Sequence, residues 1–200
     1  NADYGIRSDD GSNLTFSGNT ITDFMETGIC FNSSENSVVY NNRIIAPESG
    51  GGDLFGIWND SDWQYASIHD NYIKITNTDG NNQYGIRVRD SEVYQDTVIV
   101  NGDGCHHRIG MYCWRSNIHD NYIEVYDNAC GNTGYGIINY GNSDNRAISR
   151  NNHMILERHV VGIHGGYHDI EDNYLSTGTA EGGSWDHQNW AMSSLGHESV

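Results

Sequence analysis

A six-residue segment occurs more than once in this chain, and this repetition restricts the fold more than any other feature. The sequence IHDNYI spans Ile68 to Ile73 and returns unchanged at Ile118 to Ile123. A third copy, IEDNYL, spans Ile170 to Leu175, and looser copies of the pattern apolar-x-x-Asn-x-apolar lie at Phe16 to Ile21 and Val39 to Ile44. Such repeats indicate one structural unit stacked on itself along the chain.

A glycine between apolar or aromatic residues recurs with the same rhythm. The copies centre on Gly5, Gly28, Gly56, Gly85, Gly110, Gly136 and Gly162, so successive glycines are 23 to 29 residues apart. Around Gly85, the apolar residues alternate with Arg87 and Arg89, which is typical of a half-buried strand. Each unit has only two or three short strands, so neighbouring units must stack to bury a common core. No long segment keeps an apolar period of 3.6 residues, and we therefore expect almost no helix.

The variable turns with an asparagine at one corner resemble the right-handed parallel β-helix of the pectate-lyase-like superfamily. A left-handed β-helix would have a strict six-residue apolar period, which this chain lacks. The resemblance covers about residues 4 to 177 and implies an all-β, right-handed solenoid of about seven turns. We expect residues 1–177 to form this solenoid and residues 178–200 to form a C-terminal cap, tail or interface. The resemblance identifies no specific family, and such scaffolds carry many functions.

Aligning the turns on their glycines predicts which side chains are buried. The residues directly after the glycines are expected to form one buried column: Ile6, Ile29, Ile57, Ile86, Met111, Ile137 and Ile163. The residue before each glycine is expected to face the core as well. The second residue after each glycine is expected to face solvent: Arg7, Cys30, Trp58, Arg87, Tyr112, Ile138 and His164.

The asparagines of the repeats have a structural interpretation. An asparagine tolerates the left-handed backbone of a tight corner, and its side chain can bond the main chain. Stacked at the same corner, the amides of successive turns can also bond one another as a ladder. The predicted ladder consists of Asn19, Asn42, Asn71, Asn121 and Asn173.

The solvent-facing positions of the middle turns combine aromatic rings with arginines. Flat rings stack on sugar faces and arginine binds carboxylates bidentately, so Trp58, Tyr112 and Trp114 are candidate polysaccharide-binding residues. The resemblance implies a lyase in which arginine acts as base, often with Ca²⁺. It makes Arg87 and Arg89 the base candidates and Asp60 a candidate Ca²⁺ ligand. Two further residues, His164 and Tyr140, are candidates for proton transfer. The alternative is a solvated sheet whose rings and arginines simply pack on each other.

Charge and cysteine content limit the partners and suggest the compartment. Ten Lys and Arg against 27 Asp and Glu give a net charge of −17, which argues against a nucleic-acid partner. No apolar run is long enough to span a membrane. Of four cysteines, Cys105 and Cys130 lie at nearly equivalent points of neighbouring turns and are candidates for a disulfide, with buried free thiols as the alternative. We expect a secreted, extracellular protein.

Two functions remain open at this point. The first is a secreted carbohydrate-active or carbohydrate-binding β-helix for a polysaccharide, acidic by expectation; an enzyme of this kind would be a polysaccharide lyase or a glycoside hydrolase. The second is a structural or adhesive solenoid. Unpaired strand edges at the first turn would let copies of the chain stack end to end into filaments.

Overall fold

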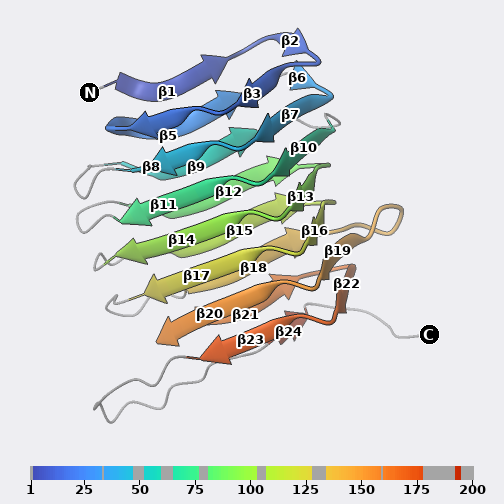
Figure 1. Ribbon diagram of the computed structural model, residues 1–200. Coiled ribbons are helices and arrows are strands. Elements are labelled where there is room, and N and C mark those ends of the chain that lie inside the picture. Colours follow the sequence, from blue (N-terminus) through green and yellow to red (C-terminus); the bar gives the residue numbers. More distant parts are fainter. Residues whose placement is uncertain are drawn as a thin grey trace.

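The computed structural model describes residues 2–32, 34–46, 52–59, 65–76, 81–102, 107–127, 134–158, 160–177 and 192–194. Within these residues every regular element is a β-strand, and neighbouring strands pair in parallel. Three long sheets run the length of the molecule, because the chain contributes one strand to each sheet in every turn (Figure 1). The prediction of an all-β parallel solenoid is therefore confirmed.

Sheet 1 contains β1 (Ala2–Ser8), β5 (Phe24–Phe31), β9 (Leu54–Asn59), β12 (Gln83–Arg89), β15 (Arg108–Trp114), β18 (Gly134–Tyr140), β21 (Val160–Gly165) and β24 (Met192–Ser194). Sheet 2 contains β3 (Thr15–Ser17), β7 (Ser37–Tyr40), β10 (Ala66–His69), β13 (Glu92–Tyr94), β16 (Asn117–His119), β19 (Ala147–Arg150) and β22 (His168–Glu171). Sheet 3 contains β4 (Thr20–Thr22), β8 (Arg43–Ile45), β11 (Tyr72–Thr76), β14 (Thr97–Gly102), β17 (Tyr122–Asp127), β20 (His153–Arg158) and β23 (Tyr174–Thr177). A small pair, β2 (Gly11–Ser12) and β6 (Ser34–Glu35), extends the first two turns.

The core consists of apolar columns that run parallel to the axis of the solenoid. In sheet 1 the predicted column is confirmed, because its seven residues from Ile6 to Ile163 pair in direct register. Six of the seven are completely buried, and Ile6 in the first turn is partly buried. Sheets 2 and 3 add columns of their own, among them Ile68 and Ile73. Each turn thus places its apolar residues on those of the next.

The recurring glycines face inward, where a neighbouring column leaves no room for a side chain. A Cβ on Gly85 would lie 2.2 Å from Val98 Cγ1 of sheet 3 and 2.5 Å from the carbonyl oxygen of Gly110. The glycine and the residue after it are therefore both buried, so the inward–outward alternation slips by one residue here while the pairing with the neighbouring strands stays in register. As a result, Tyr84 and Phe55, which precede their glycines, lie on the outer side. The prediction that the residue before the glycine faces the core is therefore wrong for Tyr84, which is partly exposed. Phe55 is covered by its stacking neighbours and is only 6% exposed, and the preceding residues Thr27, Ile109 and Val161 are buried as well.

The asparagine ladder is confirmed and is longer than predicted. Each amide donates to the side chain of the next turn at 2.9–3.0 Å, as in the Asn42–Asn71 and Asn121–Asn152 pairs. The five predicted asparagines all belong to it, and Asp96 and Asn152 are additional members. Left-handed backbone occurs one residue earlier than expected, at positions such as Asp70 and Asp120. The ladder residues themselves do not have a positive φ, since the corner is made by the residue before them.

Several predictions fall at the edges of what the structure describes. Cys30 and Cys113 are free and buried, whereas Cys105 and Cys130 lie outside the described residues, so their disulfide stays a prediction. Within the predicted C-terminal segment, β24 continues sheet 1 beside β21. Over the described ranges, no helix is long and apolar enough to cross a membrane.

Candidate functional site

Aromatic and arginine side chains gather on the outer side of sheet 1. We call this surface the aromatic face, and it consists of Phe55, Trp58, Tyr84, Arg87, Arg89, Tyr112, Trp114, Tyr135, Tyr140 and His164. These residues come from the neighbouring strands β9, β12, β15, β18 and β21. Strand register sets their order, since Arg87 pairs with Trp58 on one side and with Tyr112 on the other.

Arg87 is surrounded by rings of the aromatic face. Its guanidinium carbon is 5.5–5.8 Å from the ring centroids of Phe55, Tyr84, Tyr112 and Trp114. Cations at this distance are attracted by the electron-rich ring faces. Arg87 therefore contacts rings from three neighbouring strands.

Arg89 lies beside one of the same rings. Its guanidinium carbon lies 4.6 Å from the centroid of Trp114. The two residues pair directly across β12 and β15. Arg89 thus places a second positive charge beside the rings.

The rings meet in two geometries that differ in how much ring face they leave uncovered. Phe55 stacks on Trp58 at 5.1 Å and on Tyr84 at 4.9 Å, so these rings cover one another's faces. Tyr112 instead meets Trp114 edge-on, at 4.3 Å and 86°. An edge-on contact occupies the face of only one of the two rings. The rings of β15 and β18 therefore cover one another less than those of β9 and β12, although Arg87 and Arg89 lie over the rings of Tyr112 and Trp114.

Tyr140 adds a hydrogen-bonding group to this half of the face. Burial, together with the neighbouring Tyr112 and Tyr135, raises the pKa of its hydroxyl. Its ring also meets that of His164 at 5.7 Å and 88°. The Tyr140 hydroxyl is therefore protonated at neutral pH and can donate a hydrogen bond.

The structure brings the predicted site residues together. The predicted binding residues, Trp58, Tyr112 and Trp114, lie on one face with the catalytic candidates, which are Arg87, Arg89, Tyr140 and His164. The catalytic roles stay predictions. Asp60 lies outside the described residues, so its role as a Ca²⁺ ligand stays a prediction too. In the described part of the chain, no group of three or more His, Cys, Asp or Glu side chains is placed to hold a metal.

Two residues in the outer column differ from the prediction. Cys30 and Ile138 occupy the expected solvent-facing column, yet their exposed fractions are 0% and 4%. Each pairs with large neighbours, as Ile138 does with Tyr112 and His164, and these cover a small side chain. Sequence reasoning also missed Phe55, Tyr84 and Tyr135 as members of the face. The recurring glycine was the available signal. A position that is glycine in every turn indicates that the glycine itself faces a crowded core, so that the residue before it faces outward.

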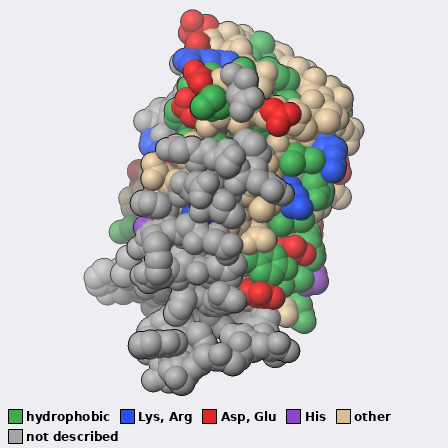
Figure 2. All heavy atoms as spheres, turned by 90° about the vertical axis from the view of Figure 1, so that its left-hand side faces the viewer, with side chains coloured by type: hydrophobic (Ala, Val, Ile, Leu, Met, Phe, Trp, Pro, Cys, Tyr) green, Lys and Arg blue, Asp and Glu red, His purple; other side chains and the backbone are tan. Residues whose placement is uncertain are grey.

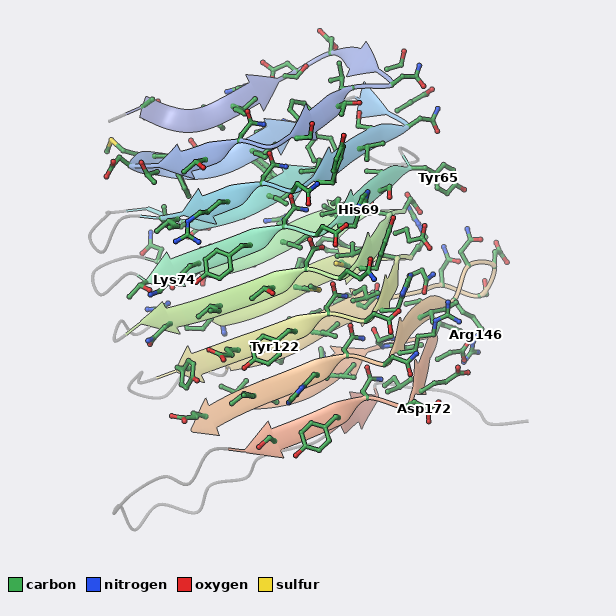
Figure 3. The ribbon with its side chains drawn as sticks, in the orientation of Figure 1. Tyr65, His69, Lys74, Tyr122, Arg146 and Asp172 are labelled. Atoms are coloured by element: carbon green, nitrogen blue, oxygen red, sulfur yellow. The ribbon has the colours of Figure 1, made fainter. Side chains whose placement is uncertain are left out.

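The other two sheets carry aromatic residues in different arrangements. On sheet 2, the rings of Tyr40, His69, Tyr94 and His119 form one continuous stack at 4.8–5.3 Å, with planes within 13° of parallel. Within this stack, the facing sides of neighbouring rings cover one another. Tyr122 lies on the outer side of sheet 3 (Figure 3). Figure 2 views the molecule from the left-hand side of Figure 1, so sheet 3 lies on the right of the picture. Acidic, basic and apolar side chains are mixed along that side. The aromatic face of sheet 1 is therefore the strongest candidate site.

Comparison with known proteins gives a family and no individual relative. The sequence profile described as "Right handed beta helix region" matches residues 1–107, which is more than half of the chain. Neither the curated proteins nor the solved structures contain a match.

Proposed function

Because the chain belongs to the right-handed β-helix family, we propose that it binds a polysaccharide along the aromatic face of sheet 1. One observation carries the proposal: rings and arginines form a continuous surface across five neighbouring strands, with Arg87 in contact with four of the rings. With a strand spacing of about 4.8 Å, the five strands give the surface a length of roughly 19 Å along the axis. This length suits an extended oligosaccharide better than a single sugar.

The chemistry of the face favours an acidic polymer. Edge-on rings such as Tyr112 and Trp114 leave a face on which a sugar can stack. Arg87 and Arg89 can pair with carboxylates, and they supply local positive charge in a chain whose net charge is −17. Because the protein as a whole repels an acidic polymer, binding depends on these two residues.

Replacing Trp114 and Arg89 separately by alanine tests the proposal. We expect Trp114→Ala to weaken binding of an acidic polysaccharide about fivefold or more at any salt concentration, because it removes a stacking surface; base stacking on an aromatic side chain is worth about 1–3 kcal/mol, and we take a sugar to be comparable. Arg89→Ala should weaken binding mainly at low salt, because dissolved ions screen an exposed charge. Affinity electrophoresis and titration calorimetry at two salt concentrations measure both effects.

Two substitutions on sheet 3 serve as matched controls. Arg43 lies 4.7 Å from the ring of Tyr72, much as Arg89 lies over Trp114, and Tyr174 is an exposed ring outside the aromatic face. We expect Arg43→Ala and Tyr174→Ala to leave binding unchanged. Equal losses in all four variants would place binding elsewhere, and no binding of the parent protein to a broad glycan panel would refute the proposal.

The remaining expectations stay predictions. These are secretion, lyase or hydrolase activity, and a dependence on Ca²⁺, none of which follows from the geometry of the aromatic face. End-to-end stacking into filaments also stays a prediction, as the alternative role for a solenoid of this kind.

A further inference from the structure

One member of the buried ladder is an acid where the neighbouring turns have asparagines. Asp96 precedes β14 and lies between Asn71 and Asn121 of the adjacent turns. Its Oδ1 accepts hydrogen bonds from the backbone nitrogen and the side-chain Nδ2 of Asn71, at 2.8 and 2.9 Å. Its own backbone N–H donates to Asn121 Oδ1 at 2.9 Å. In these three bonds Asp96 behaves as the asparagines do.

The second side-chain atom of Asp96 is in a different situation. In the neighbouring turns this atom is an amide nitrogen: Asn71 Nδ2 donates to Val39 O at 2.9 Å, and Asn121 Nδ2 donates to Val93 O at 3.0 Å. In sheet 2, Ile68 pairs with Val39 on one side and Val93 on the other. The equivalent acceptor for Asp96 Oδ2 is therefore the carbonyl oxygen of Ile68.

An ionised carboxylate does not fit this position. Asp96 is only 1% exposed, and its Oδ2 is buried with no hydrogen-bond partner among the described residues. As a carboxylate, Oδ2 would place a buried negative charge opposite the carbonyl oxygen of Ile68, which only accepts hydrogen bonds. As a carboxylic acid, it could donate one hydrogen bond where an asparagine donates through its amide.

We propose that Asp96 is a carboxylic acid at neutral pH, that it donates its proton to the carbonyl oxygen of Ile68, and that its ionisation loosens the ladder. The ladder then contains one proton-dependent link among asparagines that do not titrate. Alkaline conditions weaken the solenoid at this turn first.

The electrostatic surroundings of Asp96 agree with this assignment. Burial raises the pKa of Asp96 to about 8, against the opposing effect of the hydrogen bonds from Asn71. Asp70, at the same corner of the preceding turn, raises the pKa further through charge repulsion. At the corner of the following turn, the charged residue is Asp120; both Asp70 and Asp120 contact the ring nitrogen of the preceding histidine at 2.8 Å.

The sign of the pH dependence follows from these values. The folded protein keeps the Asp96 proton up to about pH 8, whereas the unfolded chain releases it near the ordinary value of about 4. Between these limits the folded state binds more protons than the unfolded state. The free energy of unfolding therefore falls as pH rises through this range, and above it the contribution is fully lost.

Asp96→Asn is the decisive variant, because it completes the ladder without an acid. We expect it to be more stable than the parent at pH 7 in urea unfolding. The ratio of the two folding equilibrium constants should rise about tenfold per unit between pH 5 and 7 and level off above about pH 8. Asp70→Asn is the matched control, since it makes the same carboxyl-to-amide change at an exposed corner one turn away. It should change the pH profile only slightly.

A second measurement uses the parent protein alone. With ¹³C-labelled aspartate, the carboxyl resonance of Asp96, assigned by its absence in Asp96→Asn, should titrate near pH 8 in the full chain. A resonance that titrates near pH 4 would overturn the proposal. A stability difference between Asp96→Asn and the parent that stays constant from pH 5 to 9 would overturn it as well.

Discussion

Replacing Gly85 with alanine is expected to destabilise the protein by about 3 kcal/mol or more, at the upper end of what overpacking a core costs. The new methyl group would lie 2.2 Å from Val98 Cγ1 and 2.5 Å from the carbonyl oxygen of Gly110. The valine side chain can rotate away. The carbonyl cannot move alone, because it belongs to the neighbouring strand of the same sheet. The midpoint of urea unfolding measures the loss.

Gly52→Ala is the matched control for this substitution. A Cβ at Gly52 meets no atom of the described residues within 4 Å, so the same chemical change is expected to alter stability by less than about 0.5 kcal/mol. Near-equal effects at Gly52 and Gly85 would mean that the inward orientation of the recurring glycine is wrong. The outward placement of Phe55 and Tyr84 would then be wrong too, because it depends on the inward orientation of the glycine that follows each of them.

Asn121→Ala is expected to cost about 3 kcal/mol, because it removes a side chain whose polar partners are buried. Asn121 Oδ1 accepts from the backbone of Asp96 at 2.9 Å, and Nδ2 donates to Val93 O at 3.0 Å and to Asn152 Oδ1 at 2.9 Å. Each partner left without a hydrogen bond costs about 1–3 kcal/mol, and water entering the vacated space reduces the total. Urea unfolding of the variant at pH 6 measures this cost.

Asn19→Ala provides the comparison at the end of the same ladder. Asn19 makes similar bonds, to Ser17 O and Asn42 Oδ1, but it is only partly buried. Water can replace its amide there, so the expected loss is below about 1 kcal/mol. Equal losses at Asn19 and Asn121 would show that burial does not decide the strength of the ladder.

The repeating sequence by itself determined the architecture. A stacked solenoid places equivalent residues of successive turns directly on one another, so a pattern seen in one turn predicts the next. For this reason the column from Ile6 to Ile163 and five ladder asparagines could be identified in advance. The outer positions of Arg87 and Trp114 followed from the same register.

Only the tertiary structure decided what faces inward at each glycine. Whether two consecutive residues can face inward there depends on the space left by Val98 and its neighbours, which belong to a different sheet from the strand they restrict. This slip in the alternation places Phe55, Tyr84 and Tyr135 on the outer side and completes the aromatic face. Asp96 was likewise not recognisable as a ladder residue, because the segment around it lacks the asparagine of the repeat. Its role follows from the stacking of turns, which buries this acid between asparagine side chains that the adjacent turns supply.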